Sequence, residues 1–126
     1  MEVMSLKKQD YSAKVKIDSK QNITVRNILR SLGLNTSHKG TILIIKAVQF
    51  VSASDTDFIV INDIYKLLVQ YYKNLNIKQV KMTIKYALDH RIEEKSAKNF
   101  ESIFGFEYDE YFFTNKCIIE EIARII

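Results

Sequence analysis

The chain has 126 residues but no proline and only three glycines, at positions 33, 40 and 105. A β-rich fold of this length needs many tight turns, which usually draw on glycine and proline. The scarcity of both residues favours helices joined by a few short connections. The length suits one domain, which can bury a sizeable core without disulfides or structural metal. The sequence therefore predicts an all-α, single-domain fold.

Apolar residues recur at helical spacing after a polar, lysine-bearing start. We expect residues 1–21 to form a flexible polar arm and residues 22–126 to form the folded domain. The second of its helices is apolar on nearly all sides, which is typical of a central buried helix. Residues 106–113 are expected to be irregular or a small hairpin. The domain is expected to contain six helices, at about 23–32, 40–51, 61–73, 77–94, 97–104 and 115–126.

A few residues mark where these helices begin and end. Asn22 is a candidate N-cap of the first helix, and Gly33 follows its last apolar residue, where a left-handed residue often ends a helix. Asn76 and Gln79 have the spacing of a capping box at the start of the fourth helix. The fourth helix is therefore expected to begin at residue 77.

The fourth helix separates apolar from basic residues. Lysines at positions 78, 81 and 85 share one face with Met82 and Asp89, and Gln79 and Tyr86 lie on its flanks. Residues 66–98 carry eight Lys and Arg against three acids, whereas residues 99–126 carry two against six. Such a basic block can present a surface that binds a polyanion. The alternative interpretation is that these charges lie on ordinary solvent-exposed helix faces and bind nothing. The inner face of the fourth helix is expected to consist of Ile77, Val80, Ile84, Ala87 and Leu88.

A helix, a short break and a second helix with a basic outer face are typical of a helix-turn-helix, whose second helix enters the major groove of DNA. Lysine neutralises phosphates and supplies affinity through release of counterions. Gln79 can bond a purine edge, and Met82 can contact a thymine methyl. We therefore predict that double-stranded DNA is contacted by Lys78, Gln79, Lys81, Met82, Lys85 and Tyr86.

The chain offers no recognisable set of catalytic residues, so we predict that it is not an enzyme. His38 and His90 lack metal-ligand spacing, and Cys117, the single cysteine, is expected to be a buried apolar thiol. Three glycines cannot form a glycine-rich phosphate loop, and no cofactor or metal is expected. No apolar run approaches the length of a membrane span, and the start has no apolar signal-peptide core. We expect a cytoplasmic, nucleoid-associated protein with no membrane partner.

Several short segments agree in order and spacing with a known family. They resemble the C-terminal DNA-binding effector domain of the stage zero sporulation protein A family, over about residues 23–126. The resemblance implies six helices, with a helix-turn-helix in the third and fourth, and a transcriptional or accessory regulator of a spore-forming bacterium. The matching segments are Ile28-Leu29-Arg30-Ser31-Leu32-Gly33, Lys39-Gly40, Ala47-Val48, Ile64-Tyr65, the spacing of Val80, Ile84 and Ala87, Phe104-Gly105-Phe106 and Thr114-Asn115.

The resemblance weakens in the recognition helix. The family typically has Arg-Val-Glu-Arg-Ala-Ile-Arg where residues 79–85 here are Gln-Val-Lys-Met-Thr-Ile-Lys. Met82 stands in the place of a base-reading arginine and cannot form its bidentate contact with guanine. We therefore expect altered base specificity or little sequence preference.

The resemblance also implies residues and partners outside that helix. Lys39 matches a lysine of the family motif and Arg30 replaces a histidine near the DNA, so both are implied as phosphate contacts. Family members pair on DNA, so a homodimer on DNA is implied. Residues 1–21 cannot supply the family's phosphate-accepting receiver domain, so we expect a stand-alone effector.

Two other functions stay open. A protein-interaction module that kept the fold and lost DNA recognition would contact RNA polymerase or a sigma factor through the fifth helix and the acidic end. A plasmid or phage protein would bind an origin or a transfer site. The acidic residues of the proposed protein-interaction surface are Glu101, Glu107, Asp109 and Glu110.

Overall fold

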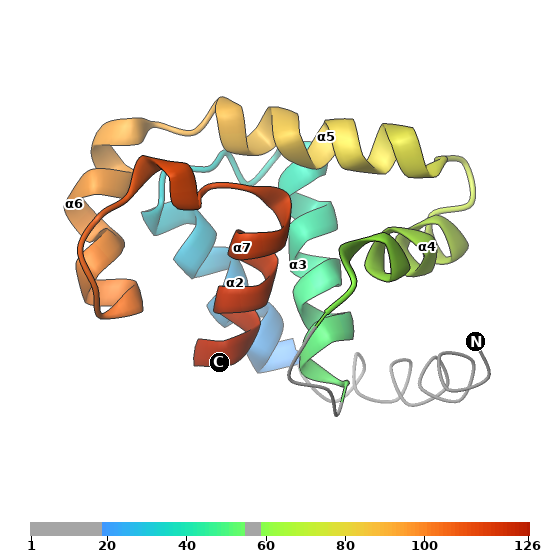
Figure 1. Cartoon of the computed structure of the whole chain (residues 1–126), viewed down its shortest axis with the longest axis horizontal. Helices are drawn as coiled ribbons and strands as arrows, with labels where there is room; N and C mark the ends of the chain where they lie inside the picture. The colour runs from blue at the N-terminus through green and yellow to red at the C-terminus, as the bar shows by residue number, and fades with distance from the viewer. Residues whose placement is uncertain (1–18, 55–58) are drawn as a thin grey trace.

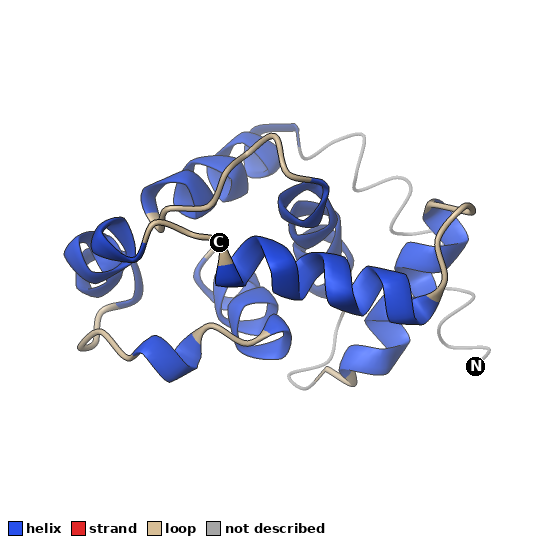
Figure 2. Cartoon of the chain, turned by 90° about the horizontal axis from the view of Figure 1, so that it is seen from above, coloured by secondary structure: helices blue, strands red, loops and turns tan. Residues whose placement is uncertain are grey.

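The computed structural model describes residues 19–54 and 59–126, which form six α-helices, one short 3-10 helix and no strand. Figure 1 shows α5 lying across the top of the molecule, with α3 and α7 running down beneath it. The view from above in Figure 2 shows only helices and loops in these described ranges. The predicted all-α fold is therefore confirmed. The elements are α2 (Ser19–Ser31), α3 (Lys39–Ser52), α4 (Ile61–Tyr71), α5 (Ile77–Asp89), α6 (Glu93–Phe104), η1 (Glu110–Phe112) and α7 (Asn115–Ile125).

Two predicted helix boundaries differ from the observed ones. α2 begins at Ser19, so Asn22 lies inside the helix and is not its N-cap. Residues 19–21 of the expected arm therefore belong to this helix, and residues 1–18 lie outside the described ranges. The helix expected over residues 77–94 is divided, because α5 ends at Asp89 and α6 begins at Glu93.

The break between α5 and α6 has a long-range cause. The backbone N–H of Ile92 donates to the carbonyl oxygen of Gly33 at 2.9 Å, which ties this connection to the end of α2. The side chains of Ser96 and Asn99 on α6 donate to the carbonyl oxygens of Leu32 and Ser31. These bonds satisfy carbonyls that the end of α2 leaves unpaired. The apolar spacing of Leu88 and Ile92 gives no sign of the break.

α3 is the central helix, as its apolar sequence predicts. Eleven of its fourteen residues are buried, and it contacts α2, α4, α5 and α7. At its first turn a Cβ on Gly40 would lie 2.2 Å from the carbonyl oxygen of Thr83 and 2.7 Å from the Cβ of Ala87. Glycine at this position therefore allows α5 to cross α3 at very short range.

Residues 106–113 form an irregular aromatic link that contains η1, and not a hairpin. Phe100 of α6 is fully buried, and five aromatic rings surround it at centroid distances of 4.9–5.9 Å. Edge and tilted contacts of this kind fix the link by packing rather than by backbone pairing. The surrounding rings are those of Phe104, Phe106, Tyr108, Phe112 and Phe113.

Candidate nucleic-acid interface

The start of α5 is fixed by the predicted capping box. The side chain of Asn76 accepts from the backbone N–H of Gln79 at 2.8 Å, and the Gln79 side chain accepts from the backbone N–H of Asn76 at 2.9 Å. The two bonds satisfy two backbone donors at the helix start. They also occupy Oε1 of Gln79. A bidentate bond from Gln79 to a purine would therefore have to use the second lone pair of Oε1 or replace the bond from Asn76.

The inner face of α5 holds the helix in one orientation. Val80 and Ile84 are fully buried, and Ala87 and Leu88 are 1% exposed. Ile77 is partly buried against the same core. This is the predicted apolar stripe, and it packs against α3, α4 and α7. The opposite face of α5 therefore faces outward along the whole helix (Figure 1).

The outer face presents cations around an apolar centre. Lys78, Lys81 and Lys85 are exposed, and Met82 and Tyr86 are 56% and 53% exposed. The ammonium of Lys85 pairs with the carboxylate of Asp89 at 2.9 Å. Both side chains of this pair are more than half exposed, so the pair is worth little and is easily exchanged for another partner.

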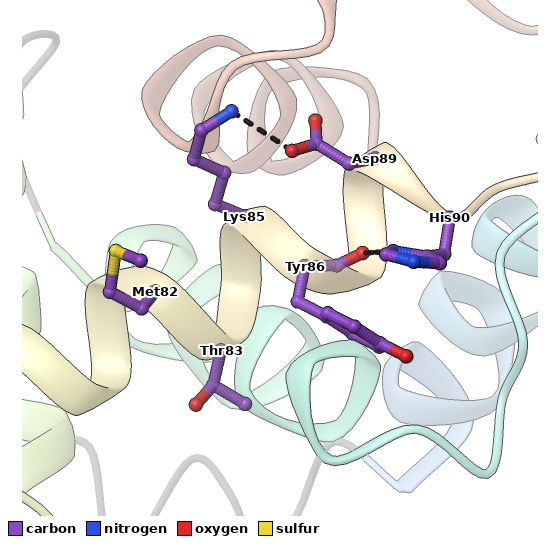
Figure 3. A pocket seen from close by; sticks show the side chains of 6 residues that line it. All are labelled: Met82, Thr83, Lys85, Tyr86, Asp89 and His90. Atoms are coloured by element: carbon purple, nitrogen blue, oxygen red, sulfur yellow. Dashed lines mark hydrogen bonds and ion pairs between the residues drawn. The ribbon is translucent and has the colours of Figure 1, made fainter.

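A shallow hollow of about 510 Å³ lies on this face (Figure 3). The ring of Tyr86 stacks on that of His90 at a centroid distance of 3.8 Å, and Nδ1 of His90 lies 2.9 Å from the carbonyl oxygen of Tyr86. His38, before α3, lies 5.6 Å from the Tyr86 ring. The Tyr86 ring therefore packs between the rings of His90 and His38 on this face. The hollow is lined by Met82, Thr83, Lys85, Tyr86, Asp89 and His90.

A second hollow of about 290 Å³ gathers lysines from two helices. Lys81 and Lys85 line it from α5, and Lys116 lines it from the first turn of α7. The Asn115 side-chain amide donates to the Lys81 carbonyl oxygen and to the Tyr65 hydroxyl, each at 3.0 Å. These bonds fix the start of α7 against α5. Because a helix start carries partial positive charge, this arrangement suits a phosphate group.

The first turn of α7 was not singled out in the sequence as part of the site. Lys116 lies in the acidic last quarter of the chain, and only the packing of α7 brings it to α5. The N-cap Thr114, whose side chain accepts from the Cys117 N–H at 3.2 Å, lines the same hollow.

Arg91 belongs to the basic block in the sequence but has a structural role. Its guanidinium donates to the carbonyl oxygen of Leu88 and to the hydroxyls of Ser96 and Tyr108. It also lies 3.8 Å from the centroid of the Phe113 ring. The Arg91 guanidinium therefore joins α5, α6 and the aromatic link.

The two predicted phosphate contacts outside α5 occupy different positions. Lys39 is exposed in the turn of α3 that crosses α5, directly before Gly40. Arg30 is exposed near the end of α2, where its guanidinium donates to the Asn27 side chain at 3.0 Å. The structure thus places Lys39 next to α5, whereas the side-chain hydrogen bond of Arg30 lies within α2.

Other predicted features can be placed within the described ranges. Cys117, expected to be a buried thiol, is only partly buried. In residues 19–54 and 59–126, no three His, Cys, Asp or Glu side chains gather closely enough to hold a metal ion. No helix in this part of the chain combines the length and the apolar character needed to cross a bilayer.

Comparison with protein-family models, with curated proteins and with solved structures gives no match for this chain. The chemistry of the site therefore rests on the residues described above.

Proposed function

We propose that the chain binds double-stranded DNA, with α4, the connection at residues 72–76 and α5 acting as a helix-turn-helix. The observation that supports this most is the cluster of exposed lysines on and beside α5. A buried inner face fixes α5, so no backbone has to be ordered before its lysines can meet a groove. The cluster consists of Lys78, Lys81, Lys85 and Lys116.

In this proposal, different residue types on α5 supply the affinity for DNA and the preference for particular bases. Lysines contact phosphates, which position a protein on DNA and carry no sequence information. Met82 and Tyr86 lie between them and offer apolar contact to thymine methyl groups. The proposed protein therefore binds with modest sequence preference, and Lys39 and Arg30 add outlying phosphate contacts.

The resemblance to the stage zero sporulation protein A effector domain supports a biological role. We propose a stand-alone transcriptional or accessory regulator of a spore-forming bacterium. Two copies on one duplex, which the resemblance implies, would give a second binding step on a longer duplex.

Fluorescence anisotropy of a labelled duplex tests the proposal. The four lysines of the cluster alone should make the affinity fall roughly 150-fold between about 50 mM and about 200 mM salt, and contacts from Lys39 and Arg30 should steepen the fall. The double variant Lys81→Ala/Lys85→Ala should bind more weakly at low salt and lower the salt slope by about two.

The matched control is Lys95→Ala/Lys98→Ala, which removes the same charge from exposed positions on α6. It should retain most of the affinity and the salt slope of the unchanged chain. Equal losses in both double variants would contradict a specific role for α5. Undetectable duplex binding at low salt would overturn the proposal altogether.

A protein-interaction module is the second candidate, and one surface favours it. Tyr111 is 81% exposed and Phe106 is 43% exposed, next to Glu107, Asp109 and Glu110. Exposed aromatic residues are enriched at protein interfaces. Capture of purified RNA polymerase or sigma factor, lost in Tyr111→Ala and combined with no duplex binding, would favour this function over DNA binding.

A further inference from the structure

Two cationic side chains, those of Arg26 and Lys46, line a small hollow between α2, α3 and α4. Its volume is about 180 Å³, below the roughly 300–1,000 Å³ typical of sites for drug-sized ligands. A nucleotide is therefore too large for it, whereas an ion of a few atoms fits. The hollow is lined by Asn22, Arg26, Ile42, Ile45, Lys46, Gln49, Tyr71 and Tyr72.

Lys46 places a positive charge at this hollow from the central helix. It is only 8% exposed, and its ammonium lies 4.3 Å from the centroid of the Tyr71 ring. The aromatic face offsets part of the cost of burial. The ion pairs of the described residues involve neither Lys46 nor Arg26. The Lys46 side chain is thus nearly buried and has no carboxylate partner, and an anion in the hollow would give its ammonium one.

The uncharged side chains at the hollow also lack partners. Gln49 is 4% exposed, and neither its Oε1 nor its Nε2 has a hydrogen-bond partner. The buried Oδ1 of Asn22 is likewise unpartnered. Buried polar atoms are nearly always hydrogen-bonded. The hollow therefore offers one unused amide donor and two unused oxygen acceptors beside two cations.

We propose that this hollow binds inorganic phosphate or a similarly small protonated phosphate group. Lys46 and Arg26 supply the positive charge, and Nε2 of Gln49 donates to a phosphate oxygen. The oxygens of Gln49 and Asn22 can only accept, so they require a ligand that carries an O–H. Phosphate retains a proton at neutral pH whereas sulfate does not, so the site selects phosphate over sulfate.

Thermal unfolding of the full chain tests this site without DNA. Phosphate should raise the unfolding midpoint in a saturable manner, because a ligand of the native state stabilises it by mass action. Sulfate at equal ionic strength measures the general salting effect that both ions share. Phosphate should exceed sulfate in the unchanged chain, and Lys46→Met should abolish the difference. Lys66→Met, at an exposed position on α4, is the matched control and should keep it.

A second measurement separates ligand binding from a general effect on folding. Titration of phosphate followed by ³¹P NMR should show saturable binding to the unchanged chain. Gln49→Leu keeps both cations and should weaken phosphate binding by at least about tenfold, the effect of losing hydrogen bonds to a charged ligand. Equal midpoint shifts with phosphate and sulfate, or no saturable ³¹P change, would overturn the assignment. Its failure would leave DNA binding by α5 unaffected, since the two sites share no residue.

Discussion

In the proposed complex with DNA, Met82 is the side chain on which base preference should depend most. It is 56% exposed at the centre of the outer face of α5, with Lys78 and Lys85 one turn away on either side. Met82→Arg introduces a fork of donors that can bond guanine bidentately. The variant should gain roughly tenfold preference for guanine at one position, as selection from a randomised duplex pool would show.

Ile92→Arg is the control for this experiment, because it adds the same charge at an exposed position outside α5. It should strengthen binding slightly and leave base preference unchanged. An unaltered preference in Met82→Arg would mean that Met82 does not face the groove.

Asp89 is the acidic residue on the outer face of α5, and it holds Lys85 at 2.9 Å. Asp89→Asn removes repulsion toward phosphates and frees Lys85, so duplex affinity at low salt should rise by up to about fivefold. Glu94→Gln removes one negative charge from an exposed position on α6 and is the matched control. Anisotropy titrations should show a larger gain in duplex affinity for Asp89→Asn than for Glu94→Gln. Equal gains would mean that the effect comes from net charge alone.

At the scale of elements, the crossing of α3 and α5 depends on Gly40. A Cβ there would meet the backbone of Thr83 at 2.2 Å, and backbone cannot yield as a flexible side chain can. Overpacking should exceed the gain in helix propensity, so Gly40→Ala should lower the free energy of unfolding by about 1–2 kcal/mol. Urea unfolding measures this loss, and duplex affinity should fall with it because α5 shifts.

Gly105→Ala provides the comparison for this prediction. A Cβ there meets nothing within 4 Å, and only the left-handed backbone, with φ +83°, opposes it. This variant should lose stability without losing duplex affinity. If Gly40→Ala is as stable as the unchanged chain, the crossing does not require glycine.

Local sequence patterns predicted the helices and their buried faces. They did not predict contacts between residues that lie far apart in the sequence. The stripe of Val80, Ile84 and Leu88 and the capping box at Asn76 are encoded within single turns, so both could be read directly. The break before α6 depends on the bond from Ile92 to Gly33, and Lys116 reaches α5 only through the packing of α7.

The polar hollow escaped prediction for a related reason. Lys46 and Gln49 lie in a helix whose sequence is mostly apolar, and their isolation becomes visible only when α2 and α4 surround them. Periodicity reports which face of a helix is buried. It does not report whether a buried polar atom finds a partner.

At the scale of the whole molecule, the buried Tyr65 and the partly buried Tyr72 should make stability fall at alkaline pH. Burial raises the pKa of Tyr65 and of Tyr72 above the ordinary value of 10.0. The folded state therefore holds these phenolic protons more tightly than the unfolded state does. Their contribution is fully present below about pH 10 and is lost as the pH rises through the raised values.

Urea unfolding from about pH 8 to about pH 11 should show this alkaline decline. Tyr65→Phe should make the decline shallower, although it loses the bond from Asn115 at all pH values. Tyr111→Phe, at a site that is 81% exposed, should leave the decline unchanged. A steeper decline in Tyr65→Phe would contradict the assigned direction of the pKa shift.

Contact between α5 and a duplex is tested most directly by NMR of the ¹⁵N-labelled chain during titration with a short DNA duplex. The amide shifts should change most over residues 78–86 and at Lys116, and little over the exposed side of α6. The changes should shrink as salt is added, because phosphate contacts carry most of the affinity. Changes centred on residues 106–111, or no changes at low salt, would contradict binding through α5.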